Sequence, residues 1–570
     1  MLADKLSFVK ENLCLFEERE TAMSVPAFNP QTHLFGLQAA HEDVFEKDNR
    51  YRLLAERVYP QLVRARPQLE SCYVSDTGRP AIEPVLLLGV SVLQFLEKVP
   101  DRAAVEQVKY HLGWKFALNV ELGGKGFDPT VLVRFRARLV EHEQARVAFE
   151  AVLSGLREAG LIARKNKQRV DSTHVLGAVA RMSTLDRARE TLRLALEEIE
   201  EKVSAEQRPQ AWAVWWERYV EERIDYRSTE ETLKAKLQQA GEDLRQLKRW
   251  VAEQGEAVKN GEKASLLGRV FEESFEEVGG AVAQRRASPA GAVQNPHDPE
   301  AQWCTKQQNN AAKEWVGYKV QVAETVEEAA PREGEPTRSF LTAVVTQPAT
   351  GSDEAGLKQT LKEQAEMGVD KPQVLFTDGS YISAELLTKW EAEGGEWIGP
   401  AQPPAQTGKS AFKSDAFEVH VEERRAFCPA AQESTQSSRL VEKETGKVSY
   451  RFEWSWRCKS CALRGACVPP DQKHRTLVVG EYHTALERRR REMKTEAFEQ
   501  RKKHRNAIEG THSELVRGHG MRRARYRGLK KVQLQNYFIG AACNVKRWIR
   551  RVQWEMKQAI PAVPTVLESS

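Results

Sequence analysis

The sequence predicts an α/β protein, α+β overall, assembled from several parts, and three observations lead to this expectation. First, 570 residues are too many for one ordinary core, so two to four domains are expected. Second, short apolar runs of strand length stand between long charged stretches with helical spacing. Third, two of these apolar runs carry or end in an aspartate, Asp171 and Asp378, and a basic helical stretch carries Glu509.

The N-terminal region, residues 1–165, is predicted to be a helical domain. Apolar residues recur at helical spacing from about Leu53 onward, and residues 86–96 indicate a buried helix. One of the later helical segments carries three positive charges, on Arg134, Arg136 and Arg138. Two interpretations stay open at this point: a helical domain that contacts DNA, or a helical core with solvated arginines.

The next part of the chain combines a strand with a large helical insertion. Residues 168–181 alternate enough to form a strand. The charged region 185–278 is expected to be helical, as an antiparallel hairpin inserted into the fold. Residues 279–299 are rich in Gly, Ala and Pro, which favours a linker or surface loop.

Strand signals then resume and define a sheet. Residues 317–323 and 340–345 are expected to pair as a hairpin, and Asp353 is expected to cap a helix that runs to about residue 367. Residues 374–377 and 396–399 are two further short strands. The resulting order of three strands, a helix and another strand is that of an RNase H-like mixed sheet. The carboxylates fall on the first strand, at the end of the fourth strand and on a late helix.

A second insertion interrupts this core at residues 401–483. It is polar, with short alternating runs that predict a small β structure, and it contains four cysteines. The helical part resumes near residue 484 and ends in a packing helix at about 532–552. The catalytic core is therefore expected to combine residues 166–184, 300–400 and 484–558, with 185–299 as the helical insertion.

Charge and apolar patterning restrict the class of protein. The chain has a net charge of +5, but residues 487–531 alone hold 16 Lys/Arg against 6 Asp/Glu, a net +10. Such a local basic block predicts contact with a polyanion. No apolar run is long enough to cross a bilayer, no signal-peptide core is present, and eight cysteines do not form a disulfide framework. A cytoplasmic protein is expected.

The three acidic residues match the needs of a two-metal phosphoryl-transfer site, because hard oxygen ligands hold pairs of magnesium ions. Each has a plainer interpretation. Asp378 follows a strand and precedes Gly379, where it could simply cap the next helix. Glu509 and Arg505 are four residues apart on a helix and could form an ordinary surface ion pair. On a strand His174 points away from Asp171, which favours a structural histidine.

The cysteines of the second insertion have the spacing of a metal site. Cys458 and Cys461 form a C-x-x-C pair, Cys467 follows six residues later, and Cys428 lies upstream. Four thiolates of this kind would hold zinc. A set of free thiols is the alternative, since the second pair is not a C-x-x-C.

Taken together, these residues resemble bacterial insertion-sequence DDE transposases, in the subgroup with a helical insertion after the first aspartate and a cysteine cluster before the glutamate. The resemblance covers nearly the whole chain. It rests on the following blocks: Gly78-Arg79-Pro80, Asp128-Pro129-Thr130 with Phe135-Arg136, Val170-Asp171-Ser172-Thr173-His174-Val175, Asp298-Pro299-Glu300-Ala301, Gly317-Tyr318-Lys319-Val320, Thr377-Asp378-Gly379-Ser380-Tyr381, and Arg505 and Glu509 with Arg522-Arg523-Ala524-Arg525-Tyr526-Arg527-Gly528-Leu529.

The resemblance implies magnesium-dependent cleavage and strand transfer at the ends of a mobile element, with Asp171, Asp378 and Glu509 as ligands of two ions and with manganese as a substitute. It implies double-stranded DNA with terminal inverted repeats and a target DNA as partners, a homodimer on that DNA, and a location at the bacterial nucleoid. The residues expected to contact DNA are Arg505, Arg522, Arg523, Arg525, Arg527, Lys530 and Lys531. Two other functions stay open: a non-catalytic DNA-binding protein derived from a transposase, and a nuclease that cuts without joining.

Overall fold

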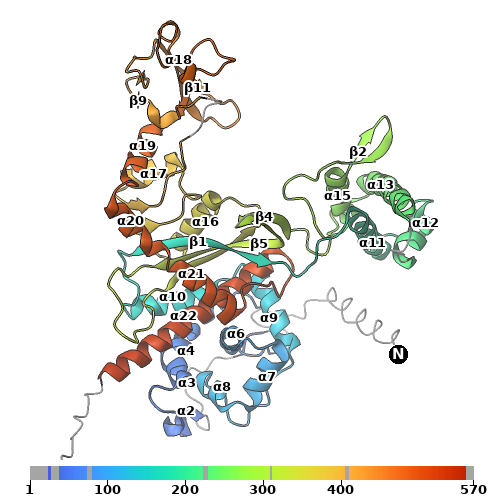
Figure 1. Cartoon of the computed structure of the whole chain (residues 1–570). Coiled ribbons are helices and arrows are strands. Elements are labelled where there is room, and N and C mark those ends of the chain that lie inside the picture. The colour runs from blue at the N-terminus through green and yellow to red at the C-terminus, as the bar shows by residue number, and fades with distance from the viewer. Residues whose placement is uncertain are drawn as a thin grey trace, which may run out of the picture. The chain divides into compact units, whose positions relative to one another are not determined.

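The structure is a computed structural model that describes residues 24–26, 37–40, 42–73, 80–222, 229–308, 311–404 and 410–559 (Figure 1). It contains two compact units. The helical unit comprises Met1–Leu161, Pro331–Thr337 and Leu515–Ser570, and the sheet unit comprises Ile162–Ala330 and Arg338–Glu514. Gly78 and Arg79, in the turn expected before the first buried helix, lie outside the described residues.

The helical unit confirms the helices expected in the N-terminal region. The longest of the early helices, α6, is buried along most of its length, and the Glu83 carboxylate accepts a hydrogen bond from its first turn. The α-helices of this unit are α2 (Leu37–Ala40), α3 (Arg50–Leu53), α4 (Tyr59–Arg64), α5 (Arg66–Glu70), α6 (Pro84–Glu97), α7 (Asp101–Tyr110), α8 (Leu112–Ala117), α9 (Thr130–Glu141), α10 (Val147–Glu158) and α22 (Leu529–Ala559).

The arginines of α9 fit neither interpretation completely. Arg136 is buried and forms an ion pair with Asp101 of α7, with Nη2 and Oδ2 2.5 Å apart. Arg138 lies over the ring of Tyr73, with its guanidinium carbon 4.4 Å from the ring centroid. Only Arg134 is exposed. This segment is therefore largely part of the packing of the helical unit.

The last helix, α22, belongs to the helical unit. Phe538 stacks on Phe95 of α6 with ring centroids 5.6 Å apart, and Tyr537 lies 6.2 Å from the ring of Phe149 on α10. The sequence analysis placed 484–558 in the catalytic core as one segment. The structure divides that segment after Glu514, because the apolar face of α22 packs on α6 and α10.

The sheet unit contains the mixed sheet that the sequence predicted. Its strands run in the order β4-β5-β1-β7-β8, and β6 pairs with β5. Strand β1 pairs antiparallel with β5 and parallel with β7, which in turn is parallel to β8. The strands are β1 (Lys167–Leu176), β4 (Gln302–Gln308), β5 (Ala311–Thr325), β6 (Leu341–Pro348), β7 (Val374–Phe376) and β8 (Glu396–Ile398). This arrangement is that of an RNase H-like core.

The register of the parallel pair brings two aspartates to one end of the sheet. Arg169 of β1 is paired with Phe376 of β7. Because the two strands run in the same direction, two further residues along each chain reach Asp171 and Asp378. Open sheets collect ligand groups at such carboxyl ends. The placement of these two residues thus follows from strand pairing.

Helices cover both faces of the sheet (Figure 1). Helices α16 (Asp353–Glu366) and α17 (Ala384–Ala392) pack on the face that carries Val170, Ala323 and Leu375. The other face receives α20 (Glu496–Lys502), whose Phe498 packs against Phe376, and α21 (Ile508–Ser513), which lies on β1. Ser352, rather than the expected Asp353, caps α16, and Asp353 is its first residue.

The helical insertion has its own core, built mainly by α11 (Thr184–Lys202), α13 (Glu230–Ala252) and α15 (Leu266–Ser274). The expectation of helix up to residue 278 is wrong. A hairpin of β2 (Phe275–Val278) and β3 (Ala281–Gln284) follows α15, because Gly279 and Gly280 adopt positive φ and turn the chain back. The expected linker also ends early, since residues 292–295 and Asp298 are buried.

The second insertion is a small β structure, as expected. Strands β9 (Glu418–His420) and β10 (Arg425–Phe427) form one hairpin, and β11 (Gln436–Val441), β12 (Val448–Glu453) and β13 (Thr476–Gly480) form a three-stranded sheet. Helix α18 (Arg464–Cys467) carries the last of the four cysteines, and α19 (His483–Glu492) returns the chain to the sheet unit. Within the described residues we find no helix long and apolar enough to span a membrane.

Candidate active site

Asp171 and Asp378 converge on one cation. The guanidinium Nη2 of Arg505 lies 2.8 Å from Asp171 Oδ2 and 3.8 Å from Asp378 Oδ2. The side chains of Asp171 and Arg505 are largely buried, whereas that of Asp378 is more open. The plain interpretation of Asp378 as a turn aspartate is therefore incomplete, because its carboxylate also faces the carboxylate on β1.

The other oxygen of each aspartate is held by the backbone. The amide of Ser172 donates to Asp171 Oδ1 at 2.8 Å, and the amide of Ser380 donates to Asp378 Oδ1 at 2.8 Å. Each carboxylate thus has one oxygen fixed by a neighbouring serine and one oxygen turned toward Arg505. Two carboxylates with matching orientations are suited to hold a common cation.

The electrostatics of Asp171 show why a cation is needed there. Burial raises the pKa of Asp171 above its usual value, and the nearby Asp378 charge raises it further. Arg505 and the Ser172 amide lower the pKa of Asp171 without cancelling the effect of burial. The ionised pair is therefore under-compensated, which is a property of sites prepared for a metal ion.

Glu509 lies on α21, exposed, four residues after Arg505 and three before His512. Glu509 and His512 share a face of α21, and Arg505 ends the short 3-10 helix Lys503–Arg505 that precedes α21. Both neighbours reach toward Asp171: Arg505 contacts it directly, and His512 Nε2 lies 3.9 Å from Asp171 Oδ2. The Glu509 carboxylate forms no hydrogen bond or ion pair with the rest of the described chain. The expected surface pair with Arg505 does not form, since Arg505 is paired with Asp171.

The helix that carries Glu509 is fastened to the sheet by a buried ion pair. Glu324 of β5 has a fully buried side chain that accepts hydrogen bonds from Arg169 Nε at 2.6 Å and from Thr511 Oγ1 at 2.8 and 2.9 Å. Arg169 also donates to the carbonyl of His504 at 3.0 Å. These contacts hold the chain on both sides of Glu509. Sequence reasoning missed Glu324, because nothing local distinguishes it from other strand residues.

The remaining prediction for this strand concerned His174. Its ring lies 5.1 Å from that of Trp315 on β5, on the side of the strand opposite Asp171. This contact agrees with a structural histidine.

The donor set at this end of the sheet fits magnesium. It consists of carboxylate oxygens, the ligands that this ion prefers, and two of them already surround a cationic group. Asp171, Asp378 and Glu509 are the residues that would hold the ions.

The basic segment after Glu509 lies in the helical unit and presents alternate side chains to solvent. Arg523, Arg525, Arg527, Lys530 and Lys531 are exposed, whereas Arg522 is partly buried. Buried Gln535 of α22 fixes the backbone between these residues: its side chain accepts from the Arg525 amide at 2.7 Å and donates to the Arg523 carbonyl at 3.1 Å. The Arg525 guanidinium carbon also lies over the ring of Phe95, 4.7 Å from the ring centroid.

The four cysteines of the second insertion line one cavity together with Trp454 and Arg475. No three of these four sulfurs lie within 4.8 Å of one another, whereas sulfurs that share a zinc ion are about 3.8 Å apart. Arg475 is fully buried and has no carboxylate partner among the described residues; its amide donates to Cys458 Sγ at 3.4 Å. The four cysteines therefore share one cavity beside a buried cation without the sulfur spacing of a closed zinc site, and zinc binding stays a prediction.

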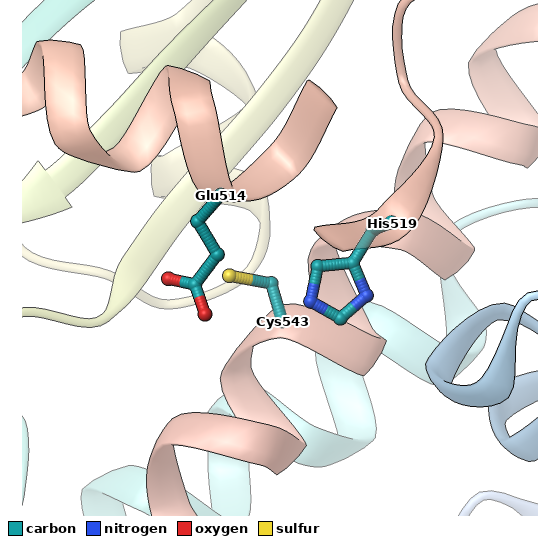
Figure 2. Close-up of side chains that lie close together, drawn as sticks. All are labelled: Glu514, His519 and Cys543. Atoms are coloured by element: carbon teal, nitrogen blue, oxygen red, sulfur yellow. The ribbon is translucent and has the colours of Figure 1, made fainter. Parts of the chain in front are cut away.

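Figure 2 draws a further group of potential ligands, Glu514, His519 and Cys543. His519 and Cys543 are buried in the helical unit, with their ligand atoms within 4.8 Å of one another. Glu514 is the last residue of the sheet unit. We assign no metal to this group.

Two family models match the chain. The model described as "Transposase DDE domain" matches residues 427–549, a span that holds Glu509, the four cysteines and the basic segment. The model described as "Transposase domain (DUF772)" matches residues 39–138 of the helical unit. A search of curated proteins found no match. The two matches precede and follow the residues of the RNase H-like sheet along the chain, and they indicate a relationship to insertion-sequence DDE transposases.

Proposed function

We propose that the protein cuts and rejoins DNA at the ends of its mobile element, with Asp171, Asp378 and Glu509 as the catalytic carboxylates. The observation that supports this most is the shared contact of Asp171 and Asp378 with Arg505. Glu509 shares a face of α21 with His512, and Arg505 lies in the short 3-10 helix before α21; both His512 and Arg505 reach Asp171. Three carboxylates from two strand ends and one helix are the ligand set of a two-metal phosphoryl-transfer site.

The carboxylates would hold two magnesium ions, which manganese can replace in experiments. When bound, such ions supply Lewis acidity to the attacking and leaving oxygens of a phosphodiester. The chain itself contributes orientation. The amides of Ser172 and Ser380 fix one oxygen of each aspartate. Glu324 and Arg169 fix the helix that carries Glu509. Arg505 places a positive charge beside Asp171 and Asp378 before the metal arrives. Water would attack a phosphodiester at the element end and break its P–O3′ bond, which releases a DNA 3′-hydroxyl. This hydroxyl would then attack a target phosphodiester and displace the 3′-oxygen of the target strand.

The DNA partners would be the terminal inverted repeats of the element and a target duplex, bound by a homodimer. The basic segment is the best candidate for a DNA-backbone contact, because its arginines are exposed and Gln535 fixes the backbone between Arg523 and Arg525. Arg505 would be able to contact a phosphate once metal has displaced it from Asp171. The cysteine insertion would bind one zinc ion as a structural staple.

Cleavage and joining assays with the full chain test this proposal. The substrate is a duplex that carries the inverted repeats bracketing the gene, with magnesium or manganese. Wild-type protein should nick the repeat end and join it to a target duplex, whereas Asp171→Asn, Asp378→Asn and Glu509→Gln should bind the same DNA without cutting it. The asparagine and glutamine variants keep the shape of each side chain and remove its charge.

The same assays separate the two alternative functions. Cleavage without any joined product would indicate a nuclease. Tight, specific binding with no cleavage by wild-type protein in either metal would indicate a non-catalytic DNA-binding protein. Wild-type rates of cutting by Asp171→Asn would remove this residue from the catalytic set.

A further inference from the structure

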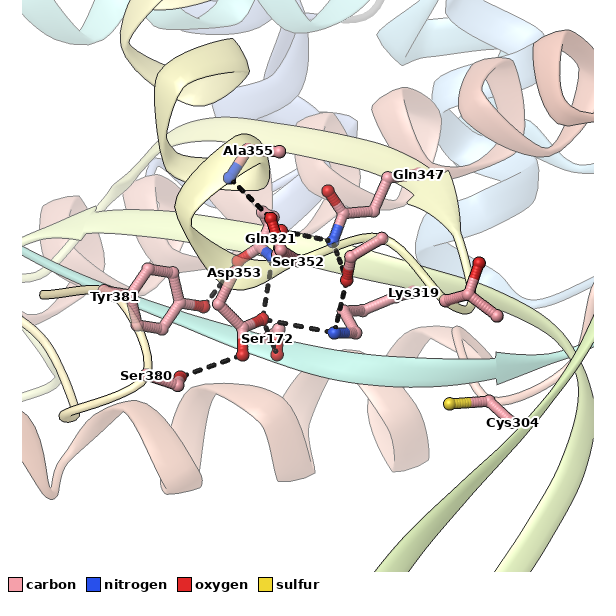
Figure 3. Close-up of polar contacts among 12 residues, drawn as sticks. Ser172, Cys304, Lys319, Gln321, Gln347, Ser352, Asp353, Ala355, Ser380 and Tyr381 are labelled. Carbon is pink, nitrogen blue, oxygen red and sulfur yellow. Dashed lines mark hydrogen bonds and ion pairs between the residues drawn. The ribbon is translucent and has the colours of Figure 1, made fainter. Parts of the chain in front are cut away.

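A fourth carboxylate, Asp353, lies directly behind the two catalytic aspartates. It is the first residue of α16, on the face of the sheet opposite α21, and its side chain is largely buried (Figure 3). It belongs to none of the sequence motifs that indicated the active site. Its contacts nevertheless reach both of the aspartates proposed to bind metal.

Two serines connect Asp353 to these aspartates in the same way. The hydroxyl of Ser172 donates to Asp353 Oδ1 at 3.1 Å, while its amide donates to Asp171. The Ser380 hydroxyl lies within hydrogen-bond distance of both carboxylates, 2.8 Å from Asp353 Oδ2 and 2.5 Å from Asp378 Oδ1, and its amide donates to the same Asp378 oxygen. Each serine therefore spans from one catalytic carboxylate to the same buried carboxylate. Strand alternation explains the first link, because neighbouring residues of β1 face opposite sides of the sheet.

Three further groups fix Asp353 as an ionised acceptor. Lys319 Nζ lies 3.3 Å from Oδ1, and Gln321 Nε2 donates to the same oxygen at 3.2 Å. Tyr381 donates to the other end of the Gln321 amide at 2.5 Å, which turns its nitrogen toward Asp353. Burial alone would raise the pKa of Asp353, but Lys319 and these donors outweigh burial and hold the pKa below its usual value. The start of α16 also favours a negative charge.

The hydrogen-bond network around Asp353 is closely packed against α16. A Cβ added at Gly356, one turn into α16, would lie 2.4 Å from Gln321 Nε2. The helix can approach Gln321 this closely only because residue 356 is a glycine. Asp353 is thus presented to both serines at a fixed distance from the sheet.

We propose that Asp353 is a positioning residue, which sets the orientation of Asp171 and Asp378 through the hydroxyls of Ser172 and Ser380 and thereby sets the affinity of the site for divalent metal. This inference rests on the proposed function, since it assigns a role at the same site. Losing the Asp353 carboxylate frees both serines. Loss of such outer-shell partners typically weakens metal binding by about 10- to 100-fold.

The test is manganese binding to the full chain, measured by titration calorimetry and by electron paramagnetic resonance, independently of DNA cleavage. Asp353→Asn should weaken Mn²⁺ binding by about tenfold or more. Glu354→Gln is the matched control, because it removes the same charge from the same turn of α16, where Glu354 pairs with Lys358. This control should bind Mn²⁺ like wild type. Equal Mn²⁺ affinity in folded Asp353→Asn and wild type would overturn the inference.

A second set of variants decides the matter if Asp353→Asn fails to fold. Ser172→Ala keeps the amide that holds Asp171 and removes the hydroxyl that donates to Asp353, whereas Ser380→Ala removes a hydroxyl that contacts both Asp353 and Asp378. Each should weaken Mn²⁺ binding. In the Asp353→Asn background, where that variant folds, Ser172→Ala should add little more, as expected for groups that act as one unit. Unchanged binding in both serine variants would also refute the role of Asp353.

The outcomes distinguish this inference from the proposed function. If Asp171→Asn abolishes Mn²⁺ binding while Asp353→Asn leaves it intact, only the inference fails. If both variants lose binding but wild-type protein cuts no DNA, the positioning role stands and the proposed reaction fails. If Asp171→Asn binds Mn²⁺ as wild type does, both fail.

Discussion

Arg505 and Asp171, 334 residues apart in the chain, form an ion pair of 2.8 Å at the carboxyl end of the sheet. The same guanidinium nitrogen lies 3.8 Å from Asp378. A permanent positive charge therefore stands between the two carboxylates that are proposed to bind magnesium. Arg505 stabilises the metal-free site, and a metal ion must compete with it for the same oxygens.

This competition predicts that Arg505→Gln binds Mn²⁺ more tightly than wild type, by about tenfold, because a neighbouring positive charge and a competing donor are both removed. The direction is opposite to that expected for Asp353→Asn. Titration calorimetry of metal into the full chain measures it. Arg501→Gln is the control, since Arg501 pairs with Glu396 away from the site. Weaker binding by Arg505→Gln would show that the arginine supports the metal rather than competing with it.

The buried pair of Glu324 and Arg169 predicts a link between stability and catalysis. Thr511→Val removes one hydroxyl that donates to Glu324, and should cost about 1–2 kcal/mol of unfolding free energy. Because Thr511 is two residues from Glu509, cleavage should fall well below the level that this destabilisation alone explains. Urea unfolding and a cleavage assay measure the two effects. Thr191→Val is the matched control, because Thr191 is a buried helical threonine in the helical insertion. This variant should leave cleavage intact.

The basic segment predicts that DNA binding becomes less dependent on salt when its exposed arginines are replaced. Replacing Arg523 and Arg525 with glutamine should weaken binding to all duplexes similarly and flatten the log–log salt slope by about 0.9 for each lost phosphate contact. Binding titrations at several salt concentrations measure the slope. Lys358→Gln with Lys362→Gln removes the same charge from the exposed face of α16 and serves as the control. A slope equal to that of wild type would mean that these arginines do not touch phosphate.

The cysteine cavity predicts one zinc ion per chain. Cys458→Ser with Cys461→Ser should lose that ion and expose residues 410–480 to protease, because the small core around Phe452 and Trp454 is built on Cys458 and Cys467. Elemental analysis and limited proteolysis measure the two effects. Cys304→Ser, outside the insertion, should retain zinc. Purified protein that contains no zinc and resists protease would contradict the site.

The contacts of Glu190 are expected to anchor the helical insertion, and this stabilisation should weaken in acid. Burial would raise the pKa of Glu190, but hydrogen bonds from Arg193 and His297 outweigh it and lower the pKa to about 2. A depressed carboxylate pKa contributes stability above the unfolded value, and this stability is lost as the pH falls from about 4.5 toward 2. Glu190→Gln should therefore destabilise the protein at pH 7, by about 2–3 kcal/mol, and much less at pH 3. Urea unfolding at pH 7 and at pH 3 tests this. An equal loss of unfolding free energy at the two pH values would exclude an ionic origin of the stabilisation.

Local patterns were sufficient to predict the elements of the core. The strands at β1, β5, β6, β7 and β8 and the helix α16 were expected in the observed order, because strand and helix periodicities are properties of short segments. Helix and hairpin boundaries were less accurate. The turn at Gly279 and Gly280 interrupts a charged stretch that reads as continuous helix, since positive φ is a property of the folded turn.

The grouping of distant segments depended on tertiary packing. The apolar face of α22 is plain in the sequence, but its packing partners are not, and in the helical unit it packs on α6 and α10. The same holds for Arg136, whose charge suggested a solvent or DNA contact. The burial of Arg136 and its ion pair with Asp101 decide its role.

The sequence by itself determined which carboxylates could be catalytic, because aspartates at strand ends and a glutamate on a basic helix are visible as local motifs. Only the tertiary structure decided what surrounds them. Arg505 turns toward Asp171 instead of Glu509, Glu324 holds the helix of Glu509, and Asp353 reaches both aspartates through two serines. Each of these contacts joins residues from separate elements whose proximity arises from strand register and helix packing, and neither of these can be read from the spacing of residues along one chain.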